Sequence, residues 1–246
     1  MSIPDNNPVL LVNGSPVDDP KKPEEHCDEL PAIRDDTTKS LDELLRKYKT
    51  EGIHKQRFWS LRLLQHILSR DRVLKELNKS PEIDAVKYVD FIRPEVNSTS
   101  GSPTYLKVFA LLVLQERGDK IVNFVHEKIS DQSLPFQLQY GIEREKVELA
   151  SKYSPKARLK CFKGWKKSEK ELFLKNQWEV LVPYFELDAK SLARNYPLDD
   201  NTILPWCTEV SKSEGGFAYV SCVKIDPLSH GFHNILKAVS WTNAPR

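Results

Sequence analysis

The sequence predicts a mainly α-helical fold that ends in a β-hairpin. Between residues 40 and 182, apolar residues recur at helical spacing in several separate segments. From Ile203 onward, β-branched and aromatic residues lie on both sides of the pair Gly215-Gly216, a pattern typical of two short strands joined by a turn. The 246 residues are enough for one or two domains with a hydrophobic core.

Charge is unevenly distributed along the chain. The formal net charge is only +2, which argues against a surface that coats nucleic acid as a whole. Residues 1–37, however, hold nine acidic and three basic residues, with many Pro and Asn and no periodic apolar face. Such a segment buries too little surface to offset the entropy of ordering, so we expect a disordered acidic tail over 1–37.

The first helices are predicted from capping signals and apolar spacing. Ser40 and Glu43 form a capping box, which begins a helix that Gly52 ends. A second helix with a wide apolar stripe is predicted from about Lys55 to Ser69, and a short one from Arg72 to Leu77.

Two Ser-Pro pairs indicate further helix starts, because serine is a good N-cap and proline suits the first helical position. These pairs are Ser80-Pro81 and Ser102-Pro103. The helices expected in this region are Ile83–Ile92, Tyr105–Gln115 and Lys120–Ile129.

The rest of the chain divides into four predicted elements. We expect a helix over Glu143–Lys152, a long helix over Trp165–Val182, and strands near 203–210 and 217–225. The predicted organisation is a tail (1–37), a helical domain (38–185), a linker (186–202) and a hairpin with its tail (203–246).

The glycine segment has two interpretations. The phosphate-covering loop of protein kinases follows the pattern Gly-x-Gly-x-x-Gly-x-Val, in which small residues let backbone amides approach ATP. With Phe217 and Val220 at the Phe and Val positions of that loop, Gly215 matches the central glycine, while Ser213 and Ala218 replace the other two. A Gly-Gly pair is also an ordinary hairpin turn.

The sequence around this segment, from Asp200 to His233, resembles a family of fungal proteins in which a helical N-terminal region leads into a protein-kinase-like domain. Three upstream segments are also similar to segments of that family: Lys107–Leu114, Ser130–Phe136 and Gln177–Phe185. The similarity covers most of residues 38–233.

The resemblance implies a kinase-like small lobe that begins near Thr202. The residues it implies for ATP binding are Gly215, Gly216, Phe217, Ala218, Val220 and Lys237. Lys237 is the candidate for the lysine that pairs with the ATP phosphates, although an ordinary tail lysine fits its surroundings better. Lys224 would lie late on the second strand and have no special role.

Catalysis by a kinase needs one aspartate in a His-Arg-Asp motif and another in an Asp-Phe-Gly motif. Neither motif occurs in the sequence. We therefore expect a truncated, non-catalytic region with no catalytic residue and no bound cofactor, since ATP and Mg²⁺ would require a complete kinase domain. The partner would be another protein or a kinase domain. The alternative is a kinase fragment that binds ATP through residues 213–220.

A second alternative is binding to nucleic acid or to an anionic surface. Basic residues surround Phe162 and Trp165 between residues 156 and 170, and such a mixture can contact phosphates and stack on bases. The competing interpretation is a solvated helix face with Trp165 in the core, which is what charge runs usually are.

No metal site is predicted. Cys207, Cys222, His230 and His233 match no compact zinc-ligand spacing. The cysteines are scattered, no basic flank precedes an apolar N-terminal run, and no apolar run approaches the ~20 residues of a membrane helix. We expect a cytoplasmic protein, with a nuclear location also compatible. Cys161, near two lysines, could have a lowered pKa.

Overall fold

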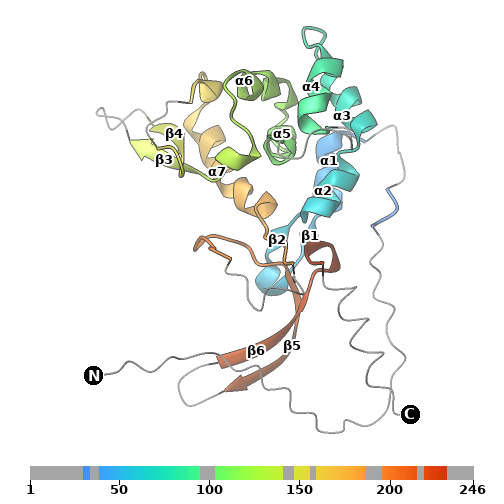
Figure 1. Ribbon diagram of the computed structural model, residues 1–246, viewed down its shortest axis with the longest axis vertical. Coiled ribbons are helices and arrows are strands. Elements are labelled where there is room, and N and C mark those ends of the chain that lie inside the picture. The colour runs from blue at the N-terminus through green and yellow to red at the C-terminus, as the bar shows by residue number, and fades with distance from the viewer. Residues whose placement is uncertain are drawn as a thin grey trace.

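The computed structural model describes residues 30–33, 39–94, 103–140, 147–155, 159–186, 196–214 and 219–231. Over these ranges the chain forms seven α-helices and three two-stranded antiparallel sheets, which confirms the mainly helical class with a C-terminal hairpin. Figure 1 shows the helices gathered into one body, with the longest hairpin extending from it. None of the helices in the described ranges is long and apolar enough to cross a membrane.

The elements have the following bounds. The helices are α1 (Leu41–Lys47), α2 (Leu61–Ile67), α3 (Arg70–Leu77), α4 (Ala85–Ile92), α5 (Leu106–Val113), α6 (Ile121–His126) and α7 (Lys167–Val180). The short 3-10 helices are η1 (Ile53–Lys55), η2 (Gly118–Lys120), η3 (Asp131–Ser133), η4 (Lys160–Phe162) and η5 (Pro227–Ser229). The strand pairs are β1 (Thr50–Glu51) with β2 (Arg57–Phe58), β3 (Phe136–Tyr140) with β4 (Val147–Ser151), and β5 (Trp206–Glu214) with β6 (Tyr219–Ile225).

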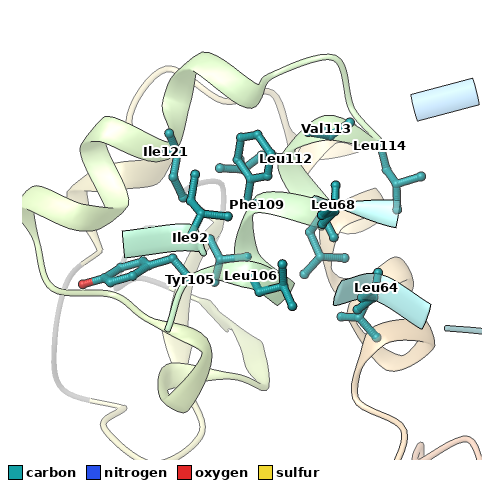
Figure 2. Packing of buried hydrophobic residues seen from close by; sticks show 14 of the residues in the cluster. Leu64, Leu68, Ile92, Tyr105, Leu106, Phe109, Leu112, Val113, Leu114 and Ile121 are labelled. Atoms are coloured by element: carbon teal, nitrogen blue, oxygen red, sulfur yellow. The ribbon is translucent and has the colours of Figure 1, made fainter. Parts of the chain in front are cut away.

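Helix α5 is the centre of the core. Residues 108–114 are at most 3% exposed, because α1, α2, α4, α6 and α7 all contact α5. Figure 2 shows Leu64, Ile92 and Ile121 arranged around the α5 side chains. A helix that is apolar on every side is stable only when it is enclosed in this way, which is why the most hydrophobic segment of the chain lies in the middle of the body.

An aromatic cluster joins α6 and α7 to the β3–β4 hairpin. The cluster packs edge-to-face and stacked rings with centroids 5.1–6.2 Å apart, and its members are Phe124, Phe136, Phe162, Trp165 and Phe173. Beside it, the buried amide of Gln177 donates from Nε2 to the Phe136 carbonyl (2.9 Å) and accepts at Oε1 from the Phe136 N–H (2.7 Å). This side chain satisfies the backbone of β3 at the point where it meets α7.

The structure corrects the predicted helix over Glu143–Lys152 from residue 147 onward, while residues 143–146 lie outside the described ranges. Residues 147–151 form strand β4, which pairs with β3 so that Leu138 lies opposite Leu149. Leu149 and Ala150 are buried, and Leu149 belongs to the main hydrophobic core. Burial of these residues and pairing with β3 outweigh a weak local helix preference.

Several helices also begin at other residues than predicted. The helix expected from Lys55 begins at Leu61, because residues 50–58 form the β1–β2 hairpin and Ser60 caps α2 by accepting from the Leu63 N–H (3.3 Å). The helix expected from Ile83 begins at Ala85, where Asp84 rather than Ser80 is the N-cap. The predicted capping interaction at α1 is confirmed, since Glu43 Oε2 accepts from the Ser40 N–H (3.1 Å).

Candidate functional site

The β5–β6 hairpin contains the predicted phosphate-covering segment. The two strands pair antiparallel from Trp206↔Ile225 to Glu214↔Tyr219, so the expected strands are confirmed with shifted bounds. Val220 lies on β6 and is 68% exposed. The other predicted ATP-binding residues, Gly215, Gly216, Phe217, Ala218 and Lys237, lie outside the described residues. Their role in ATP binding stays a prediction.

Beyond its base, the hairpin has exposed side chains on both faces. Val210 and Val220 are 57% and 68% exposed, and Lys224, opposite Thr208, is also exposed. In the part of the chain that the structure describes, neither β5 nor β6 pairs with a third strand. The register shifts between Trp206 and Thr208 and again between Glu209 and Ser211. Such irregularities increase the twist of a ribbon.

The base of the hairpin is fixed to the helical body by close backbone approach. A Cβ atom added to Gly52 would lie 2.8 Å from the Trp206 carbonyl oxygen and 3.1 Å from Phe58 Cε1. Gly52 precedes η1, and η1 contacts β5. A glycine is therefore required at this position for β5 to pack against the β1–β2 region.

A second attachment follows β6 directly. The Asp226 N–H donates to the Pro205 carbonyl (2.7 Å), and the Ser229 hydroxyl donates to Asp226 Oδ2 (2.6 Å). Asp226 and Ser229 are buried, and burial raises the pKa of the Asp226 carboxyl. Next to them, Leu228 joins the main hydrophobic core, in which η5 contacts α2.

A backbone bridge completes this attachment. The Phe185 N–H donates to the Ser229 carbonyl and the Gly231 N–H donates to the Phe185 carbonyl, both at 2.9 Å. Residues 185 and 230 thus lie side by side although the predicted linker separates them in sequence. Sequence reasoning missed this polar anchor. Its one local signal is Asp226-Pro227, an N-cap with proline in the first turn.

The basic stretch does not offer its aromatic rings for base stacking. Phe162 and Trp165 are buried at 3% and 7% exposure in the aromatic cluster. The Arg117 guanidinium lies 4.8 Å from the Trp165 ring centroid and also pairs with Glu169. The interpretation with Trp165 in the core is therefore confirmed. Phosphate contacts by the exposed lysines Lys163, Lys166 and Lys167 stay a prediction.

Within the described residues, no group of three or more His, Cys, Asp and Glu side chains could hold a metal ion. Cys207 is partly buried, and desolvation together with the Asp226 charge raises its pKa to about 11. Cys161 is buried, which raises rather than lowers its pKa, so the expectation of an activated thiol is wrong. His233 lies outside the described residues.

Two charged clusters inside the body have structural roles. Asp131 Oδ1 accepts from the Val108 N–H (2.9 Å) and its Oδ2 accepts from the Thr104 hydroxyl (3.0 Å), so it caps the first turn of α5. Lys49 pairs with Glu179 at 2.6 Å and lies 4.5 Å from the Trp59 ring centroid. Burial raises the pKa of Asp131 and lowers that of Lys49. Both clusters join segments that are distant in sequence.

Comparison of the chain with protein-family models, with curated proteins and with solved structures found no match.

Proposed function

We propose that these residues form a non-catalytic interaction or regulatory region, in which the β5–β6 hairpin is a docking element for further strands of a kinase-like small lobe. The observation that carries this proposal is the contrast between the two ends of the hairpin. Its base is held by Gly52, Asp226 and Ser229, whereas Val210 and Val220 farther along are largely exposed.

The edges of this hairpin supply the means of docking. Among the described residues β5 and β6 pair only with each other, so each strand has one edge whose backbone groups have no strand partner. Such an edge can accept another strand by main-chain hydrogen bonds, and exposed side chains on the added sheet then give specificity. Exposed polar residues along β5, such as Thr208 and Lys212, would limit unspecific pairing.

The proposal assigns ATP no role in this chain. A kinase site needs the lysine of a third strand, a helix glutamate that pairs with it and two aspartates. The sequence contains neither aspartate motif, and the described part of the hairpin has only two strands. The resemblance to fungal kinase-like proteins supports an origin of the hairpin in a kinase lobe. The activity proposed here is association.

Co-purification tests this proposal. The full chain would be expressed together with a kinase-like domain of the fungal family from which the first two strands have been deleted. We expect the two chains to form a stoichiometric complex, in which backbone amides of β5 and β6 exchange hydrogen more slowly than in the chain alone.

A matched pair of variants makes the test specific. Val220→Asp places a charge on the proposed docking strand, while Val86→Asp places the same charge on α4 at an equally exposed valine, 66% against 68%. We expect at least a tenfold loss of complex with the first variant and no loss with the second. Absence of any complex, or equal binding by both variants, would overturn the proposal.

A further inference from the structure

A basic hollow lies where residues 30–33, α2, the end of α4 and η5 meet. Its volume is about 430 Å³ and its lining residues are Leu30, Arg62, Gln65, His66, Arg93 and Leu228. Two arginines and a histidine thus face the same space, and none of the described residues that line it is a carboxylate. This hollow lies apart from the exposed hairpin strands to which association is assigned.

The sequence places these groups together through helix geometry. Arg62, Gln65 and His66 are at positions i, i+3 and i+4 of α2 and so share one face of the helix. Arg93 is the C-cap of α4. His66 Nε2 donates to the Pro31 carbonyl (2.8 Å), which holds the ring beside the N-terminal segment.

Among the described residues, the acid nearest to Arg93 in sequence is Asp90, and it is already engaged. Asp90 Oδ1 pairs with Arg70 at 2.6 Å, and the same guanidinium donates to the Arg93 carbonyl (3.3 Å). In the described ranges, neither Arg62 nor Arg93 forms an ion pair. The Arg93 side chain is nevertheless half-buried, and desolvation lowers its pKa. A cation in this position loses hydration without an ion-pair partner among the described residues, a cost that a bound anion would offset.

We propose that Arg62 and Arg93 form a binding site for a phosphate-class oxyanion, beside the His66 ring whose Nε2 already donates to Pro31. Guanidinium groups present planar pairs of N–H donors that match phosphate oxygens, and Gln65 adds a further donor. Leu30 and Leu228 give the hollow apolar walls, and its volume exceeds that of a single phosphate group. The chemistry therefore suits the phosphate of a small organic phosphoester.

Titration of the full chain with inorganic phosphate at constant ionic strength, followed by amide chemical shifts, tests the site. We expect saturable shifts at residues 62–66 and 93. Arg62→Gln and Arg93→Gln should each weaken binding at least tenfold. Arg57→Gln removes the same charge from an exposed position outside the hollow and should leave binding unchanged. Unchanged melting temperatures would show that the variants are folded.

Two outcomes would overturn the proposal. One is the absence of saturable shifts, or equal weakening by Arg57→Gln and Arg93→Gln. The other concerns the carboxylates next to Leu30. If phosphate binds only to a full-length variant with Asp28→Asn and Glu29→Gln, the occupant of the hollow is the acidic segment of the chain itself. Equal phosphate binding by this variant and the unaltered chain supports the proposal.

Discussion

Asp226 is a buried carboxyl whose hydrogen bonds hold the base of the hairpin. Its folded-state pKa is raised above the ordinary 3.8 by burial, so the folded chain holds this proton more strongly than the unfolded chain. The stabilising effect of that proton is complete below pH 3.8 and is lost as the pH rises through the folded-state pKa. At neutral pH the buried charge therefore lowers stability.

Replacing the Asp226 carboxyl by an amide should remove the loss of stability that the buried charge causes at neutral pH. We expect Asp226→Asn to raise the melting temperature at pH 7, with a gain that shrinks as the pH falls through the raised folded-state pKa of Asp226 and no longer changes below pH 3.8. Thermal unfolding across this pH range measures the effect, and Asp200→Asn at an exposed turn is the control. A gain that is the same at every pH would contradict the assignment of the penalty to ionised Asp226.

Thiol reactivity should follow burial. Cys222 is exposed, Cys207 is partly buried with a pKa raised to about 11, and Cys161 is buried. Because the thiolate is the reactive form, we expect iodoacetamide to modify these three described cysteines in order: Cys222 first, Cys207 slowly and Cys161 only after unfolding. Peptide mass spectrometry with time gives the order. Equal rates at Cys161 and Cys222 in the native chain would be inconsistent with the packing around η4.

Only some of the side-chain interactions in the structure could be predicted from the sequence. The Ser40–Glu43 cap could be predicted because both partners lie within one turn of helix. The interactions of Asp226, Gln177 and Asp131 could not, because most of their partners come from other elements. For the same reason, the basic hollow could not be found from the sequence, since Arg93 lies 27 residues after His66.

At the scale of elements, the β5–β6 hairpin depends on close packing against residues 50–58. Gly52→Ala would place a methyl group 2.8 Å from the Trp206 carbonyl, so the backbone must move. We expect a loss of about 1–3 kcal/mol in the free energy of unfolding, together with faster hydrogen exchange in β5. Chemical denaturation and hydrogen exchange measure the two effects.

Gly118→Ala is the matched control for this change. Gly118 is buried and Gly52 is partly buried, but a Cβ added to Gly118 would meet its nearest atom at 3.5 Å, an ordinary contact distance. Equal effects of the two substitutions would show that β5 is not held at Gly52.

The β3–β4 hairpin is an element whose secondary structure could not be predicted from its local sequence. Residues 136–140 and 147–151 are short, and the second segment fits a weak helix as well as a strand. Its state is decided by burial of Leu149 in the main hydrophobic core and by pairing with β3. Helices α5 and α7 could be predicted because each has a long apolar pattern of its own.

At the scale of the whole molecule, the helical body and the base of the hairpin form one packed unit. Leu228, which follows β6, belongs to the same hydrophobic core as α2 and α5. The hairpin base is therefore attached to the body, while the rest of β5 and β6 is exposed. This arrangement suits a region that binds through an exposed sheet edge.

The central claim is that this chain acts by association and not by ATP chemistry. Calorimetric titration of the full chain with Mg-ATP tests it most directly. We predict no saturable heat at millimolar nucleotide, because the His-Arg-Asp and Asp-Phe-Gly motifs, whose aspartates serve catalysis and metal binding in a kinase, do not occur in the sequence. Saturable binding that Gly215→Asp abolishes would contradict the claim and identify residues 213–220 as a nucleotide loop.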